Sequence, residues 1–130
     1  MTNVAKALYG FFSGFGLPAF VENNVPDEMP DESGNMQPVK PPYITYQLIE
    51  PDSLSEASFY ARVWYYDTSF EAISAKVDEI RRAIGRGKSI PIDGGCVWIW
   101  RDNNFCQFQP PDEPALKIAY LQMILGAYNY

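Results

Sequence analysis

Histidine is absent from this sequence. It is the usual general base near neutral pH and a common zinc ligand, so its absence argues against many hydrolases and metalloenzymes. The sequence also lacks a Gly-x-Ser-x-Gly turn that would present a nucleophilic serine. We therefore predict that the protein is not an enzyme and that it needs no metal and no cofactor.

Cysteine is nearly absent, with Cys96 and Cys106 as the two examples. A turn at Asn103-Asn104 would make residues 96–108 a hairpin and would leave the two thiols about 16 Å apart along it. A disulfide needs Cα atoms within about 7 Å. We expect two buried free thiols, as is usual in a reducing compartment.

Long apolar runs and an excess of basic residues are also missing. No run approaches the ~20 apolar residues that cross a bilayer, and residues 1–6 lack the features of an export signal, so we expect no membrane partner. The formal net charge is −6, which argues against DNA binding through phosphate neutralisation. Four basic residues within 81–88 are typical of a helix C-terminus.

The strongest local pattern is a helix that begins at Thr68 and ends at Gly85. Thr68 and Glu71 have the spacing of a capping box, and Gly85 can adopt the left-handed conformation that ends a helix. An apolar stripe at helical spacing predicts one buried face. The stripe comprises Phe70, Ile73, Val77, Ile80 and Ile84.

Aromatic and β-branched residues predict strands on both sides of this helix. Residues 43–49 and 57–66 are predicted to form an antiparallel pair. In the second strand, Tyr60, Arg62 and Trp64 share the outer face, and a face this aromatic indicates a partner surface. Residues 96–101 form a further strand after a turn at 93–95.

The ends of the chain are less regular. Residues 3–16 favour an amphipathic helix that packs on the core or contacts another subunit. Residues 17–25 can form a short edge strand, and residues 26–42 combine acidic side chains with prolines, which predicts a flexible, extended acidic loop. Residues 115–128 favour a central strand, although a helix is also compatible with the pattern.

Together these elements predict one domain, 1–130, of the α+β class. The sheet is expected to be mixed and mainly antiparallel, with about four to five strands flanked by two helices.

The order of these elements, with one local motif, resembles the tail terminator (tail completion) proteins of long-tailed bacteriophages. The motif is Lys40-Pro41-Pro42-Tyr43-Ile44-Thr45-Tyr46 at the entry to the sheet, followed by a helix that begins Thr68-Ser69-Phe70-Glu71. The resemblance covers most of the chain. It implies a minor tail protein that forms a ring, typically a hexamer, on the tail tube, stops polymerisation and presents a surface for the head.

The resemblance implies four partners: further copies of the chain, the tail tube protein, the head–tail connector, and DNA that passes through without specific binding. It also implies a place in the virion tail or neck, after assembly in the host cytoplasm. The acidic balance suits such a bore, because like charges repel. Two alternatives remain: a head–tail joining (neck) protein, or a small ligand-binding domain or enzyme built on Trp98, Trp100 and Phe105, which the predicted hairpin places on one side. The residues expected at subunit contacts are Phe11, Phe15, Asp27, Glu28, Asp31, Glu32, Trp64, Trp98, Trp100 and Phe105.

Overall fold

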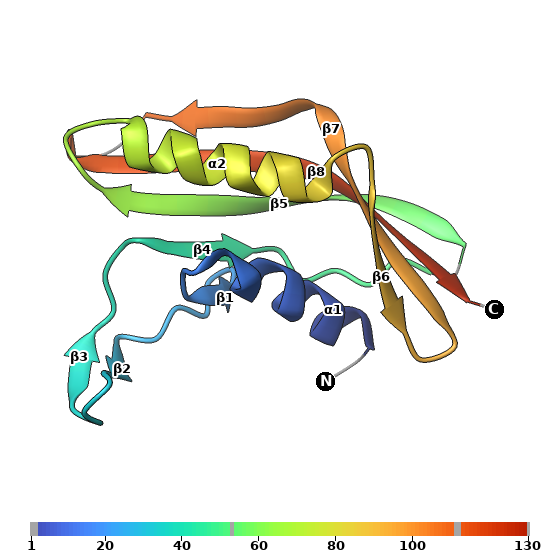
Figure 1. Cartoon of the computed structure of the whole chain (residues 1–130), viewed down its shortest axis with the longest axis horizontal. Helices are drawn as coiled ribbons and strands as arrows, with labels where there is room; N and C mark the ends of the chain where they lie inside the picture. Colours follow the sequence, from blue (N-terminus) through green and yellow to red (C-terminus); the bar gives the residue numbers. More distant parts are fainter. Residues whose placement is uncertain (1–2, 53, 111–112, 130) are drawn as a thin grey trace.

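The computed structural model describes residues 3–52, 54–110 and 113–129 (Figure 1). None of the helices within these ranges is long and apolar enough to cross a bilayer. The elements in chain order are α1 (Asn3–Phe12), the short 3-10 helix η1 (Ser13–Phe15), β1 (Ala19–Val21), β2 (Glu28–Pro30), β3 (Met36–Pro38), β4 (Tyr43–Tyr46), β5 (Ser55–Tyr66), α2 (Glu71–Ile84), β6 (Lys88–Ile92), β7 (Gly95–Gln109) and β8 (Leu116–Asn129).

The main sheet has six strands in the order β1-β4-β5-β8-β7-β6. β1 runs parallel to β4, and every other neighbouring pair is antiparallel. The predicted α+β class with a mixed, mainly antiparallel sheet and two helices is therefore confirmed. The predicted number of four to five strands is too low, because short edge strands such as β6, which contains Pro91, give little signal in the sequence.

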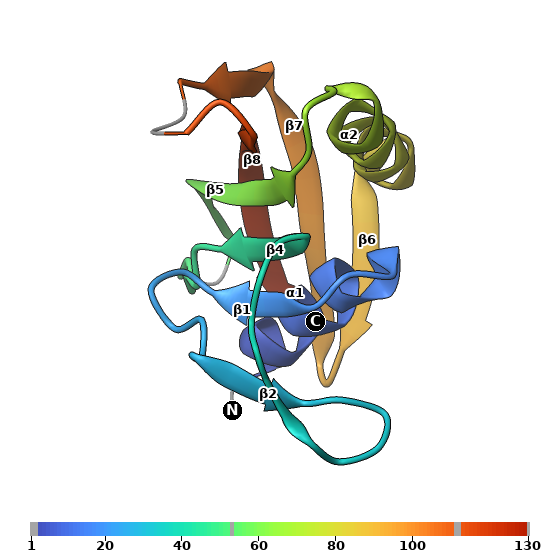
Figure 2. The same ribbon diagram turned by 90° about the vertical axis from the view of Figure 1, so that its left-hand side faces the viewer.

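Both helices contribute to one core on one face of the curled sheet (Figure 2). Alternation along β5 places Phe59, Ala61 and Val63 in this core, as predicted. The strand β8 lies between β5 and β7, which confirms the prediction of a central strand for the end of the chain. Core side chains from the helices are Ala7, Leu8, Phe12, Ile73, Val77, Ile80 and Ile84.

The predicted start of α2 at Thr68 is wrong. The helix begins at Glu71, and the hydroxyl oxygen of Ser69 accepts a hydrogen bond from the Glu71 N–H at 3.1 Å. The Asp67 carboxylate in turn accepts from the Ser69 N–H at 3.2 Å. These bonds hold residues 67–70 in a turn, so Phe70 lies outside the helix and is 50% exposed.

The predicted hairpin at Asn103-Asn104 is also wrong, because β7 continues from Gly95 to Gln109 and pairs with β8 on both sides of this segment. The register shifts between Arg101 and Cys106, so residues 102–105 form an irregularity of the β-bulge kind. Turn-forming side chains therefore distort a long strand here without reversing it. The actual reversal joins β6 to β7 at Asp93-Gly94, within the predicted turn.

Residues 27–39 form a hairpin in which β2 and β3 pair with each other, and we call this segment the arm. The sequence predicted an extended loop here. Two short strands form instead, and residues 26–38 are all exposed. The arm projects from the end of the molecule at which β1 and β4 lie (Figure 1).

Candidate subunit interface

The face of the sheet opposite the helices carries three groups of aromatic side chains, and we call it the open face. Its composition follows from strand alternation, because the neighbours of buried residues in β5 must point away from the core. Strand register then places residues from β4, β7 and β8 beside them. The open face comprises Phe20, Glu22, Tyr43, Tyr60, Arg62, Trp64, Trp98, Trp100, Tyr120 and Tyr128.

The first group is centred on an ion pair between Arg62 of β5 and Glu22, which directly follows β1. Their side chains are 24% and 13% exposed. The Arg62 guanidinium also lies 4.9 Å and 5.5 Å from the ring centroids of Tyr60 and Tyr120, which stack on each other. This arrangement ties the edge strand β1 to the centre of the sheet and removes most of both charges from water.

The second group links Phe20, Tyr43 and Trp64 through two ring contacts, each with 5.8 Å between centroids. The indole N–H of Trp64 donates to the Thr45 hydroxyl at 2.9 Å, which satisfies its polar edge. Burial, with a smaller effect of the Glu22 charge, raises the pKa of Tyr43. The phenol of Tyr43 is therefore neutral across the physiological range.

The third group contains Trp98 and Trp100, which stack with centroids 5.9 Å apart and planes 12° apart. Tyr128 meets Trp100 edge-on at 6.5 Å. A Cβ at Gly87 would lie 2.9 Å from the Trp100 indole nitrogen, and one at Gly126 would lie 3.0 Å from the same ring. The two glycines thus leave the space in which the Trp100 ring packs against the backbone.

The structure separates the residues that the sequence predicted at subunit contacts. Trp64, Trp98 and Trp100 lie on the open face, but Phe105 lies in the core, with the Arg81 guanidinium 5.4 Å from its ring centroid. The predicted common side of Trp98, Trp100 and Phe105 is therefore wrong, because residues 102–105 shift the register of β7. The remaining six lie elsewhere, with Phe11 and Phe15 beside a hollow next to α1 and with Asp27, Glu28, Asp31 and Glu32 on the arm.

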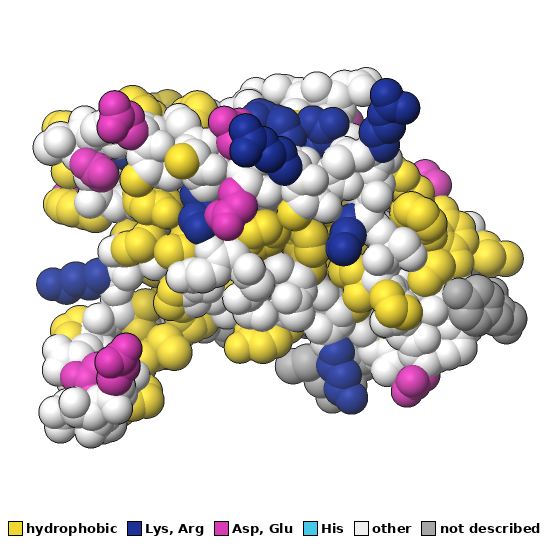
Figure 3. Space-filling view, in the orientation of Figure 1, with side chains coloured by type: hydrophobic (Ala, Val, Ile, Leu, Met, Phe, Trp, Pro, Cys, Tyr) yellow, Lys and Arg dark blue, Asp and Glu magenta, His cyan; other side chains and the backbone are white. Residues whose placement is uncertain are grey.

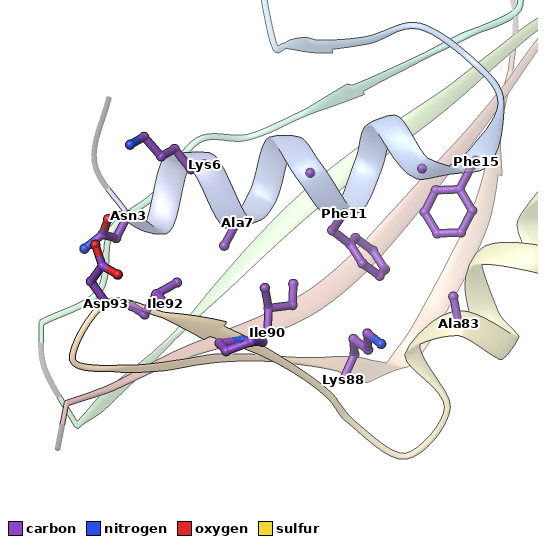
Figure 4. Close-up of a pocket in the computed structure, with 13 residues that line it drawn as sticks. Asn3, Lys6, Ala7, Phe11, Phe15, Ala83, Lys88, Ile90, Ile92 and Asp93 are labelled. Atoms are coloured by element: carbon purple, nitrogen blue, oxygen red, sulfur yellow. The ribbon is translucent and has the colours of Figure 1, made fainter.

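A hollow of about 740 Å³ lies between α1 and β6, and Phe11 and Ile90 point into it from opposite sides (Figure 4). A second hollow, of about 640 Å³, is lined by Trp100 and Phe105 together with arginines. Two of these arginines already have partners, since Arg101 donates to the Gly85 carbonyl at 3.0 Å and Arg81 pairs with Asp78.

The described side chains offer little nucleophilic or metal-binding chemistry. Within residues 3–52, 54–110 and 113–129, no three His, Cys, Asp or Glu side chains are close enough together to hold a metal ion. Burial raises the pKa of the Cys106 thiol, and only the thiolate form is a strong nucleophile. The sites therefore offer aromatic surface and fixed charges for contact with another molecule.

Sequence reasoning missed several residues of the open face, notably Glu22, Tyr120 and Tyr128. Glu22 lies 40 positions before Arg62, and no local pattern connects them. Tyr120 could have been placed beside Tyr60 only if the β5–β8 register had been known.

Comparisons of the chain with protein-family models, with curated protein sequences and with solved structures gave no match.

Proposed function

We propose that this chain is a structural subunit of a ring that ends the tail of a long-tailed bacteriophage. The observation that carries the proposal is the open face, where eight aromatic residues and Arg62 lie in ring contacts on a surface that neither α1 nor α2 covers. Tryptophan, tyrosine and arginine are the side chains most enriched at the energetic centres of protein interfaces. An aromatic face of this kind is suited to contact with another subunit.

The resemblance described above supports the more specific parts of the proposal. The ring is proposed to be a hexamer that sits on the tail tube, stops its polymerisation and offers a surface to the head connector. The formal charge of −6 supports a bore through which DNA slides without binding. The assembled ring would act in the virion after the subunits are made in the host cytoplasm.

Electron microscopy of particles that lack this chain tests the proposal directly. Overlong tails without heads would support a tail terminator. Tails of normal length that fail to join heads would instead support the alternative, a head–tail joining protein. Normal infectious particles would overturn both.

A pair of substitutions tests the role of the open face in assembly. We expect Trp98→Gln to reduce capture of the chain by the tail tube protein at least tenfold, because Trp98 belongs to the open face. Phe108→Gln is the matched control, since Phe108 is 45% exposed but packs against Phe70 near α2. Equal capture of the two variants and the unchanged chain would show that the open face is not the contact surface.

The alternative of a different class, a small ligand-binding domain or enzyme, would use the hollow beside Trp100 and Phe105. Its arginine lining would favour an anionic ligand. Binding of inorganic phosphate or a nucleotide there, lost on Arg86→Ala, would favour this alternative over the ring.

A further inference from the structure

The hollow between α1 and β6, which we call the groove, has an apolar floor and two basic residues among those that line it. Phe11, Ile90 and Ile92 contribute to the floor, and Lys6 and Lys88 are the basic residues. Lys88 lies on β6, and the Lys6 side chain extends outward from α1 (Figure 4). Gly10 of α1 and Gly14 of η1 also line the groove, and a Cβ at either position would meet no atom within 4 Å, so there is open space beside both. The groove can therefore accept side chains from outside without a rearrangement of α1.

The groove also borders an edge of the sheet. Among the described strands, β6 is the last in the sheet order and pairs with β7 on one side, so none of them pairs with the backbone groups of its second edge. Such an edge is a common place for a segment of another chain to bind.

The arm has the properties that complement this groove. Residues 26–38 contain Asp27, Glu28, Asp31 and Glu32 and no basic residue. Two apolar side chains on the arm are exposed, with Met29 at 37% and Met36 at 56%. They lie on opposite faces of the hairpin, because Met29 is paired with Gln37 and Met36 with Pro30. Methionine adapts its shape to irregular apolar surfaces, so the more exposed Met36 suits a floor of Phe and Ile.

Hydrogen bonds within the arm hold it in shape before any contact. The Val39 N–H donates to the Asp27 carbonyl at 2.9 Å, which closes its base. The Asp31 carboxylate accepts from the N–H groups of Ser33 and Asn35 at 2.9 and 3.0 Å, which fixes its tip. Binding of this preformed hairpin would order few additional residues, which lowers the entropic cost of association.

We propose that the arm of one copy docks in the groove of the next copy. Met36, which shares one face of the hairpin with Glu28 and Pro30, would cover the apolar floor, and the carboxylates would pair with Lys6 and Lys88. Asp93 lies beside Asn3 at one end of the groove, with Lys88 toward the other (Figure 4). The acidic tip of the arm would therefore lie toward Lys88, away from the like charge.

The contact joins two different surfaces, because the arm projects from the molecule apart from α1 and β6, which border the groove (Figures 1 and 3). A contact between unlike surfaces repeats from copy to copy and produces a ring when its rotation closes. The inference thus rests on the proposed ring and names one of its interfaces. If the arm only lined the bore, association between copies would not depend on Lys6 or Lys88.

A charge exchange tests the inference. The groove variant carries Lys6→Glu and Lys88→Glu, and the arm variant carries Glu28→Lys and Glu32→Lys; all four side chains are exposed, so the fold should persist. Sedimentation velocity measures association of each variant alone, of their mixture and of the chain with all four changes. We expect each variant alone to associate at least tenfold more weakly than the unchanged chain. The mixture, and the chain with all four changes, should associate about as strongly as the unchanged chain.

The matched control is Lys40→Glu with Arg82→Glu, which changes the charge equally at exposed positions outside the groove and should leave association intact. Association that is the same in all variants would overturn the arm contact and leave the ring proposal standing. A chain that stays monomeric up to about 1 mM, alone and in the mixture, would also overturn the arm contact. The ring itself would still be decided by the tail lengths in particles that lack the chain.

Discussion

At the scale of single residues, the ion pair between Arg62 and Glu22 is the feature on which the shape of the open face depends. Arg62 contacts two tyrosine rings and a carboxylate from the edge of the sheet. One oxygen of Glu22 is buried without a hydrogen-bond partner in the described chain. The carboxylate is thus held mainly by its pairing with Arg62.

Glu22→Gln should lower the free energy of unfolding by about 1–3 kcal/mol, because it leaves the charge of Arg62 largely buried without its counterion. Urea unfolding followed by tryptophan fluorescence measures the change. Asp78→Asn is the matched control, because the Arg81–Asp78 pair has side chains 39% and 53% exposed. The control should change stability by less than about 0.5 kcal/mol, and an equal loss in both variants would contradict this interpretation.

Gly87 is constrained by its backbone and by its neighbour. Its φ is +153° and the Trp100 ring occupies the space of a Cβ. We expect Gly87→Ala to lower stability by about 1–3 kcal/mol and to shift the fluorescence of Trp100. Gly10→Ala, in the last turn of α1 with open space around it, should instead raise stability by up to about 0.5–1 kcal/mol. If thermal unfolding showed the same change in stability for Gly87→Ala and Gly10→Ala, the contact between Gly87 and Trp100 would not contribute to stability.

Several tyrosines should make the free energy of unfolding decrease at alkaline pH. Burial raises the pKa of Tyr43, Tyr46 and Tyr65 above the ordinary value of 10.0. Above that value the unfolded chain loses protons that the folded chain keeps, so these groups stabilise the fold below about pH 10 and the effect is lost as pH rises further. Unfolding measured from pH 8 to 11 should show this decline. Tyr46→Phe should make the decline shallower, and an unchanged slope would argue against Tyr46 as a contributor.

At the scale of elements, the start of α2 separates what the sequence predicted from what the structure shows. Ser69, rather than Thr68, accepts the hydrogen bond from the first helical N–H. Ser69→Ala should therefore lower the free energy of unfolding by about 0.5–1 kcal/mol, whereas Thr68→Ala should change it little. Thermal unfolding of both variants decides between the two residues, and a larger loss at Thr68 would restore the capping box.

Element identity was predictable where one periodicity dominated. The spacing of Ile73, Val77, Ile80 and Ile84 indicated the buried side of α2, and alternation in β5 indicated both of its faces. The ends of the elements were harder to predict. The start of α2 is an example, because Asp67, Thr68 and Ser69 can all cap a helix. Asp102-Asn103-Asn104 has the composition of a turn, and only pairing with β8 makes it part of a strand.

Part of the candidate interface was also predictable, because side chains alternate along a strand. Trp98 and Trp100 are two positions apart in a strand, so their common face followed from the sequence. The parallel pairing of β1 with β4 places Glu22 within reach of Arg62, and that pairing depends on contacts between distant segments. Phe105 was assigned to the wrong side because a register shift changes the alternation beyond it.

At the scale of the whole molecule, the arm is separate from the core. Its hydrogen bonds are internal, and residues 26–38 are exposed. Replacement of residues 28–38 by a short Gly-Ser linker should change the free energy of unfolding by less than about 1 kcal/mol, because little apolar area is lost from the core. Urea unfolding measures this value. A large loss would show that the arm stabilises its own subunit and would argue against a role in contacts between subunits.

The position of β8 affects how the chain can fold while it is being made. β8 leaves the ribosome after every other element described here, yet it is the strand that joins β5 to β7. Until it emerges, the nascent chain presents the long edges of β5 and β7 without partners, a state that favours aggregation and chaperone binding. The two parts of the sheet can therefore join only after β8 has been made, so completion of the core depends on the last of the described strands to be synthesised.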